Sequence, residues 1–208
     1  MEENYYWSDD FSTDFYIKAA KCGFITTSMY KKDNFYLLPE IQFDYALLDF
    51  KDIKVPKKVS KLLKEKNYTF SVNSRFDEVC QKIKTYHDHS WLKDEYINIL
   101  KNINNRKDLV PNFKLISVEV SDLHTNELIS GEIGYKINNI YTSLTGFRKK
   151  EKRYNNWGKL QLVLLCDYLV TNAYSFWNLG HPQLQYKLDL GAKIYNRKDF
   201  LKRWNNNI

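Results

Sequence analysis

A histidine near the C-terminus stands where it could move a proton. His181 follows residues 176–179, an aromatic and branched run typical of a strand. An imidazole has a pKa close to neutral pH, so it can act as a base toward a reacting amine. The alternative is a structural histidine that caps the turn or packs beneath Pro182. Tyr186 and Lys187 follow within a few residues and could position a substrate, or could form an ordinary surface pair.

Basic side chains occur in two segments that could bind phosphates. Residues 57–64 predict an amphipathic helix with a polar face of lysines, and residues 148–153 form a second basic run. Gly158 and Lys159 then open a strongly apolar helix, whose positive N-terminal end could hold a phosphate. The chain has 32 Lys and Arg against 25 Asp and Glu, a net charge of +7, which favours a polyanionic partner. Plain solubility and a solvated helix face would explain the same charges.

Cysteines and histidines are too scattered to predict a disulfide framework or a metal site. Cys22, Cys80 and Cys166 lie in apolar patterns without CxxC pairs, so we expect reduced core residues in a cytoplasmic protein. His87 and His89 alternate like half of a metal site but have no further ligands at suitable spacing. The chain does not open with a basic start and an apolar segment, and no run approaches the ~20 apolar residues of a membrane span. We therefore expect no metal, no secretion and no membrane insertion.

The apolar pattern predicts one folded core with a small appended subdomain. Apolar residues make up 43% and charged residues 27% of the 208 residues, a balance typical of a folded domain. Their spacing predicts helices over 12–22, 57–64, 75–86, 93–103, 158–173 and 198–204. It predicts strands over 35–38, 41–50, 68–72, 115–120, 128–135, 140–147 and 174–179, and a loop over 104–112.

This order of elements indicates an α+β fold. A meander with a bulged central strand, then a buried helix and one more strand, resembles the GCN5-related N-acetyltransferases, which have a mixed sheet flanked by helices. We expect a small N-terminal α/β subdomain over 1–56 and an acyl-transferase-like catalytic domain over 57–208.

Several short motifs occur in an order that is known from one protein family. They are Ser90-Trp91-Leu92, Ser117-Val118-Glu119-Val120, Leu128-Ile129-Ser130-Gly131 with Gly134, and Leu190-Gly191-Ala192 with Arg197. In order and spacing they resemble the leucyl/phenylalanyl-tRNA-protein transferase family. The resemblance implies an enzyme that moves an amino acid, Leu or Phe by family default, from charged tRNA to the N-terminal α-amine of a protein in the N-degron pathway. It implies aminoacyl-tRNA and an acceptor protein or peptide as partners and no cofactor, and we expect a monomer.

The resemblance also assigns roles to individual residues. Trp91 matches a tryptophan that packs against the terminal adenosine of tRNA, although core packing would explain it as well. The basic residues that would contact tRNA phosphates are Lys57, Lys58, Lys61, Arg148 and Lys159. The apolar residues that would form the aminoacyl pocket, or simply the core, are Leu144, Leu160, Leu162 and Leu165.

Two functional positions of the family differ in this chain. The glutamate that helps to hold the substrate amine aligns with Leu144, so that contact is lost or relocated. The catalytic glutamine aligns with Leu179-Gly180-His181, which makes His181 the candidate base and leaves Asn178 or Gln183 as alternatives after a small shift. An aminoacyl ester is already activated, so the reaction needs an oriented neutral amine and a stabilised oxyanion rather than a covalent nucleophile or a metal.

Three other functions stay open at this point. Leu179-Gly180-His181 and Tyr186-Lys187 also resemble elements of the arginyl-tRNA-protein transferases, which would transfer arginine to acidic N-termini. A coenzyme A-dependent N-acyltransferase fits the same fold, but no Gly-x-Gly turn precedes the helix at Gly158. An RNA-binding module without activity is consistent with the altered positions Leu144 and His181.

Overall fold

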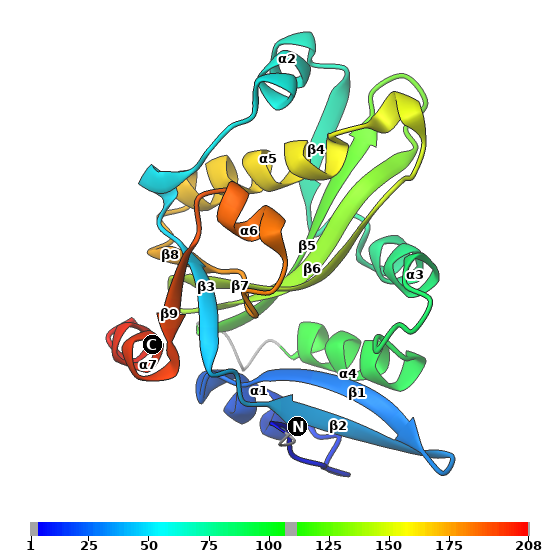
Figure 1. Cartoon of the computed structure of the whole chain (residues 1–208). Helices are drawn as coiled ribbons and strands as arrows, with labels where there is room; N and C mark the ends of the chain where they lie inside the picture. The colour runs from blue at the N-terminus through cyan, green and yellow to red at the C-terminus, as the bar shows by residue number, and fades with distance from the viewer. Residues whose placement is uncertain (1–3, 107–111, 208) are drawn as a thin grey trace.

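A seven-stranded mixed sheet forms the centre of the molecule (Figure 1). The computed structural model describes residues 4–106 and 112–207. The strands of this sheet are β3 (Asp44–Leu48), β4 (Tyr68–Val72), β5 (Phe113–Asp122), β6 (Leu128–Ile137), β7 (Ile140–Arg148), β8 (Phe176–Asn178) and β9 (Lys193–Asn196). They lie in the order β4-β5-β6-β7-β8-β3-β9. β7 and β8 run parallel, and the other neighbouring strands of this sheet are antiparallel.

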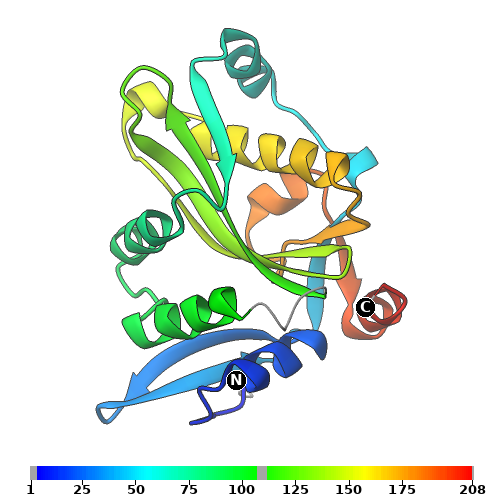
Figure 2. The ribbon, with the colours of Figure 1, turned by 180° about the vertical axis from the view of Figure 1, so that it is seen from behind.

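Helices cover both faces of the sheet. The helices α3 (Phe76–Tyr86) and α4 (Asp94–Asn105) contact one face, while α5 (Trp157–Thr171) and α2 (Lys57–Glu65) lie on the other (Figures 1 and 2). The short helices near the C-terminus are α6 (Gln185–Asp189) and α7 (Arg197–Asn205).

Strand β5 is buried on both of its faces, although it also carries the polar residues Ser117 and Glu119. Successive side chains of a strand point to opposite faces. Leu115 joins the buried cluster that contains α3 and α4, and Ile116 joins the cluster that contains α5. A strand that lies between two helical layers needs apolar residues on both faces.

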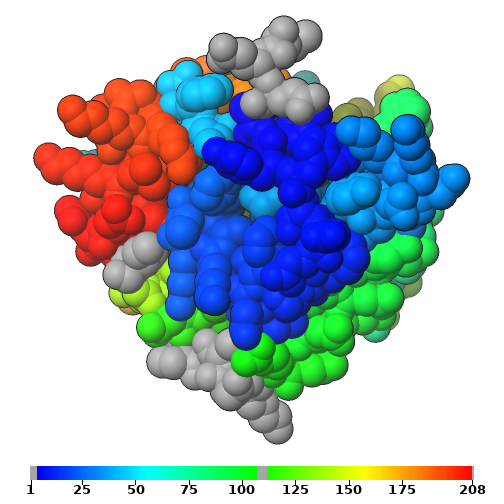
Figure 3. Space-filling model, turned by 90° about the horizontal axis from the view of Figure 1, so that it is seen from below, coloured from blue at the N-terminus to red at the C-terminus, as the bar shows by residue number. Residues whose placement is uncertain are grey.

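The N-terminal residues form a separate layer. The Ser12 side chain caps α1 (Thr13–Lys21) by accepting a hydrogen bond from the backbone N–H of Phe15. After α1, β1 (Ile25–Lys31) and β2 (Asn34–Glu40) pair as an antiparallel two-stranded hairpin. Seen from below in Figure 3, this layer covers the end of the molecule.

Several predicted element bounds are wrong. The sequence prediction missed β1, α6 and β9, and it took Pro39 as a separator, whereas Pro39 lies within β2 opposite Thr26. On the outer edge of β2, Pro39 accepts a hydrogen bond from the backbone N–H of Tyr6 with its oxygen, and the missing N–H of proline is tolerated at the edge of a sheet. The predicted strand over 41–50 is shorter, because β3 spans Asp44–Leu48. The predicted loop over 104–112 begins inside α4, and residues 107–111 lie outside the described residues.

Strand β3 also bears on the expected domain boundary. It falls inside the predicted subdomain 1–56 but is hydrogen-bonded to β8 and β9 of the main sheet. A division at residue 56 stays a prediction, and residues Asp44–Leu48 are part of the large sheet in any case.

The three cysteines do not share one environment. Cys80 and Cys166 are buried free thiols, as expected, but Cys22 is exposed. The prediction for Cys22 is wrong because this residue is the C-cap of α1, beyond the apolar face of that helix. None of the helices in the described part of the chain is long and apolar enough to cross a membrane.

Candidate functional site

A cleft opens where two parallel strands separate. β7 and β8 pair only from Ile140 to Thr142, and the chain then leaves β7, because Leu179 donates its backbone N–H to Ala46 of β3. In the part of the chain that the structure describes, the rest of β7 has no neighbouring strand on that edge. A cleft of about 470 Å³ occupies the gap. Its lining includes Glu132, Ser143, Leu144, Gln161, Leu162 and Lys187.

A β-bulge in β7 shapes this cleft. Gly134 pairs with Ser143 and Ile133 pairs with Thr145, which leaves Leu144 as the extra residue. The three consecutive residues from Ser143 to Thr145 all line the cleft. The bulged central strand that the sequence predicts is therefore confirmed, and it supplies a Leu144 side chain to the cleft wall.

A buried carboxylate lies in the same wall. The Glu132 side chain is on β6 and the residue is only 5% exposed. Tyr141 Oη and Ser143 Oγ donate hydrogen bonds to Oε1 at 2.8 and 2.7 Å, and Gln161 Nε2 donates to Oε2 at 2.7 Å. Burial raises the pKa of Glu132, while these hydrogen bonds and the charge of Lys187 act in the opposite direction. Three neutral donors thus hold an acid that water does not surround.

Gly134 makes room for one of these donors. A Cβ atom at this position would lie 2.4 Å from the Tyr141 hydroxyl and 2.4 Å from the Thr142 carbonyl oxygen. Only glycine permits the close approach that brings the Tyr141 hydroxyl to Glu132.

Lys187 supplies a second buried charge to the cleft. This residue of α6 is 7% exposed, and its Nζ donates a hydrogen bond to the backbone oxygen of His181 at 2.6 Å. Burial lowers the pKa of Lys187 to about 8, although the charge of Glu132 opposes the shift. No ion pair joins Lys187 to Glu132 in the described structure. The cleft therefore holds an amine that is partly neutral near physiological pH.

A basic hollow adjoins the cleft. It has a volume of about 330 Å³ and is lined by Lys58, Arg148, Asn155, Asn156, Gly158 and Lys159. Arg148, Gly158 and Lys159 line the cleft as well, so the two spaces are neighbours that share part of their walls. The N-terminus of α5 lies here, with Asn156 as an N-cap whose side chain makes no capping hydrogen bond. Three cations and the positive end of a helix favour an anion in this hollow.

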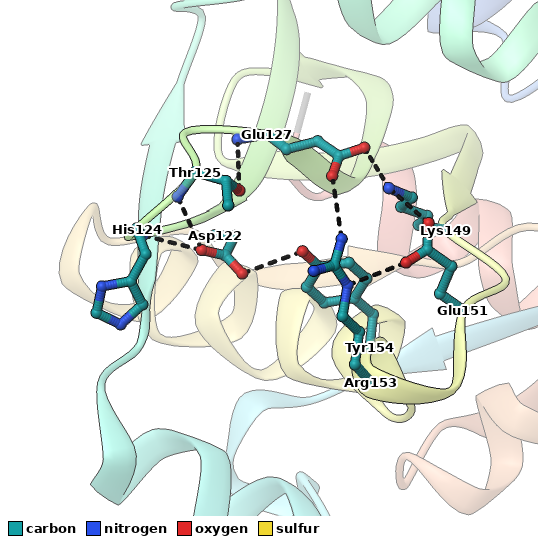
Figure 4. A network of polar contacts seen from close by, with 8 residues as sticks. All are labelled: Asp122, His124, Thr125, Glu127, Lys149, Glu151, Arg153 and Tyr154. Carbon is teal, nitrogen blue, oxygen red and sulfur yellow. Dashed lines mark hydrogen bonds and ion pairs between the residues drawn. The ribbon is translucent and has the colours of Figure 1, made fainter.

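Two cations of the basic run after Arg148, Lys149 and Arg153, are paired within the protein (Figure 4). Lys149 forms ion pairs with Glu127 and Glu151, and Arg153 also contacts both carboxylates. Tyr154 donates its hydroxyl to Asp122 of β5 at 3.1 Å. This network fastens the segment before α5 to the β5–β6 turn. It uses charges that the sequence suggested for phosphate binding.

The predicted tRNA-binding residues do not all lie together. Lys58, Arg148 and Lys159 meet in the hollow. Lys57 is exposed on α2 outside the hollow, and Lys61 forms an ion pair with Glu65 at 3.6 Å. Trp91 lies outside both spaces, half-buried with its ring edge-on to Tyr96 at 5.0 Å.

The four residues predicted for the aminoacyl pocket lie in two environments. Leu144 and Leu162 line the cleft. Leu160 and Leu165 do not, because each is fully buried in a core cluster, which was the alternative for all four. Apolar residues occur on most sides of α5, so periodicity could not say which side faces the cleft, and the pocket itself stays a prediction.

The three predicted catalytic residues lie beside the cleft rather than in its lining. The His181 ring accepts a hydrogen bond at Nδ1 from the backbone N of Gln183 at 3.2 Å. Asn178 is buried, accepts from the backbone N of Gly180 and donates to Thr142. Gln183 is exposed. These contacts match the structural alternative for His181, and a catalytic role for the three residues stays a prediction.

The sequence prediction missed the polar lining of the cleft. Glu132, Ser143 and Gln161 were not identified, and His87 was considered only as a metal ligand. Its Nε2 instead lies 3.0 Å from the Gly146 oxygen of β7. One available signal was the charge of Glu132 within an otherwise apolar strand, since buried charges concentrate at functional sites. Within 4–106 and 112–207, no cluster of His, Cys, Asp and Glu could hold a metal ion.

Two solved structures resemble this fold at low sequence identity. The GCN5-related glucosamine N-acetyltransferase region of a fungal multi-domain GH3 β-N-acetylglucosaminidase has a TM-score of 0.53 and 14% identity, covering 91% of this chain and 23% of that chain. FemX has a TM-score of 0.52 and 9% identity, covering 88% of this chain and 66% of that chain. At such identities the similarity shows the fold alone, and it confirms the expected α+β acetyltransferase-like sheet.

Sequence comparison identifies the family. Residues 47–205 match the family model described as leucyl/phenylalanyl-tRNA protein transferase. A leucyl/phenylalanyl-tRNA–protein transferase of Shewanella pealeana is 25% identical over 156 residues, which are 73% of this chain and 60% of that protein. The predicted resemblance is thereby confirmed, and this chain belongs to the leucyl/phenylalanyl-tRNA protein transferase family, a family of transferase enzymes.

Proposed function

We propose that the chain transfers an amino acid from aminoacyl-tRNA to the N-terminal α-amine of a protein, with Leu or Phe as the donor residue by family default. Such an added residue would mark the acceptor protein for degradation. The proposal extends the family membership to a particular donor, acceptor and consequence.

One observation carries this proposal: the cleft and the basic hollow lie side by side and share Arg148, Gly158 and Lys159 in their linings. The cleft offers apolar surface from Leu144 and Leu162 next to buried polar groups, which suits an amino acid. The hollow offers cations, which suit phosphates. A charged tRNA end has both chemistries in one molecule, an aminoacyl group joined to a polyanion.

For this reaction the protein has to position the two substrates and supply one group that accepts a proton. The acceptor nitrogen attacks the ester carbonyl carbon, an amide bond forms, and the ester bond to the ribose oxygen breaks. The amine proton has to leave, and the ribose oxygen has to gain one. We assign the proton transfer to Lys187, because its amine lines the cleft and its pKa of about 8 leaves a neutral fraction at physiological pH. The His181 ring is the weaker candidate, since it does not line the cleft.

A transfer assay tests the proposal. The protein is incubated with tRNA charged with labelled Leu, Phe or Arg, together with peptides that differ in their N-terminal residue. We expect label in peptides with a free α-amine and none in the same peptides after N-acetylation. Label from arginyl-tRNA alone, on acidic N-termini, would replace the Leu or Phe assignment with arginyl transfer. No label from any donor, with acetyl transfer from acetyl-CoA instead, would contradict the proposal.

A further inference from the structure

Glu132 is a buried carboxylate whose hydrogen-bond donors are all neutral groups. A carboxylate offers about four acceptor positions. Tyr141 and Ser143 fill two at Oε1, and Gln161 fills one at Oε2. No ion pair to Glu132 occurs within the described ranges of the chain. One acceptor position on a residue that lines the cleft is left to a ligand.

A second buried carboxylate, Glu119, has a purely structural set of contacts and can be compared with Glu132. Glu119 on β5 is 1% exposed and does not line the cleft. It accepts hydrogen bonds from the hydroxyls of Ser71 and Ser117 and from the backbone N–H groups of Ser74 and Arg75. Four donors fill its four positions and fasten the start of α3. Glu132 has one donor fewer and faces open space.

Lys187 acts on Glu132 through its charge but makes no ion pair with it among the described residues. Its Nζ is held by the His181 oxygen rather than by the carboxylate. Leu144, the bulge residue of the neighbouring strand, brings no charge to the cleft. The unfilled acceptor position of the Glu132 carboxylate is therefore best matched by a positively charged N–H donor from a substrate. Charge-assisted hydrogen bonds to a desolvated carboxylate are stronger than those between neutral groups.

We propose that the Glu132 carboxylate is the receptor for a cationic group of the acyl donor, so that the cleft selects donors with a free ammonium or guanidinium group over isosteric uncharged donors. This inference rests on the proposed function, because it concerns the donor of that reaction. The cation has two possible sources, the α-ammonium group of the aminoacyl ester or a cationic side chain.

The experiment compares kcat/KM at pH 7 for three tRNA donors. One carries leucine, with an α-ammonium group only. The second carries 2-hydroxy-4-methylpentanoic acid, which has the same shape and no cation. The third carries 2-hydroxy-5-guanidinopentanoic acid, with a side-chain cation only. The same peptide acceptor is used with each.

We expect the wild-type protein to prefer one cationic donor over the uncharged donor by at least about tenfold. A preference for leucine assigns the α-ammonium group, and a preference for the guanidino donor assigns the side chain. In Glu132→Gln the preference should fall close to one, while the uncharged donor should still be used. The matched variant Glu119→Gln removes a buried charge outside the cleft and should keep the wild-type preference.

Three results would overturn the inference. If the wild-type protein uses all three donors equally, the inference about Glu132 is contradicted and the proposed function is unaffected. The inference fails in the same way if Glu132→Gln keeps the preference, or if this variant loses all three donors by the same factor. If no donor is used even by the wild-type protein, the proposed function itself fails and this inference fails with it.

Discussion

Lys187 Nζ donates a hydrogen bond to the backbone oxygen of His181 at 2.6 Å. The lysine of α6 thereby reaches back to the turn that follows β8, and it lines the cleft while the histidine ring does not. The imidazole instead stays with its own turn through Gln183. The amine to which we assign the proton transfer is therefore held in place by the backbone of the residue that the sequence favoured.

Replacing this amine should slow transfer. We expect Lys187→Met to lower the single-turnover rate by about 10²-fold, because a positioned proton acceptor contributes roughly that factor. Lys187→Arg keeps the charge but cannot give up its proton at these pH values, so it should be slowed as well. The wild-type rate should rise toward pH 8 for two reasons, the deprotonation of the acceptor amine and the deprotonation of Lys187. Both variants should show only the rise that comes from the acceptor amine. A Lys187→Met variant with the wild-type rate and pH profile would return the role to His181.

The same lysine predicts a stability profile. Its pKa is lowered from 10.5 to about 8 in the folded protein, so below pH 8 the folded state keeps a buried charge. Between pH 8 and 10.5 the folded state loses this proton before the unfolded state does, and stability should rise with pH. A shift of this size corresponds to roughly 3 kcal/mol. We expect Lys187→Met to gain stability over wild type at pH 7 by up to roughly that amount, less about 1 kcal/mol for the lost hydrogen bond.

Urea unfolding of the two proteins at several pH values measures this difference. The gain of Lys187→Met should shrink steadily from pH 8 to 10.5. A difference that does not change with pH would show that Lys187 titrates normally in the folded protein.

The basic hollow should account for part of the affinity for tRNA. Arg148→Ala and Lys159→Ala each remove one cation from it, so each should weaken binding and reduce the slope of log affinity against log salt by about one. Lys202→Ala makes the same charge change on the exposed side of α7 and serves as the control. Filter binding between 50 and 200 mM salt would reveal the slopes. Equal slopes for all three variants would place the tRNA elsewhere.

Gly134 should tolerate no side chain. An added Cβ would lie 2.4 Å from both the Tyr141 hydroxyl and the Thr142 carbonyl oxygen, and the backbone oxygen cannot move aside cheaply. We expect Gly134→Ala to destabilise the protein by about 1–3 kcal/mol through overpacking. At Gly158 the nearest atom is 3.2 Å away, on the flexible Arg148 side chain. Gly158→Ala in α5 should therefore leave the melting temperature unchanged or slightly higher.

Local patterns predicted the layers of this protein better than they predicted its cleft. The two buried faces of β5 and the capped start of α1 follow from side-chain period and capping chemistry. The contact between Glu132 and Gln161 depends on how α5 packs against β6, which no local spacing encodes. Apolar residues occur on most sides of α5, so sequence could not separate Leu162 in the cleft from Leu160 in the core.

The positions of Glu132 and Leu144 allow a rescue experiment. Both line the cleft from adjacent strands, and a carboxylate at either place would face the same space. If Glu132 supplies the anion that the family places at the position of Leu144, a carboxylate at residue 144 should substitute for it. We expect the double variant Glu132→Gln with Leu144→Glu to regain a preference for the cationic donor of at least about threefold over Glu132→Gln alone, less than the full charge-assisted bond provides.

The single variant Leu144→Glu puts two carboxylates in one cleft, where like charges raise the pKa of one of them, so this variant should gain little preference over wild type. Competition between leucyl and 2-hydroxy-4-methylpentanoyl donors measures the ratio in each variant. A double variant that behaves like Glu132→Gln would mean that the anion has to sit on β6, beside Tyr141 and Gln161, because only there do neutral donors hold it in place.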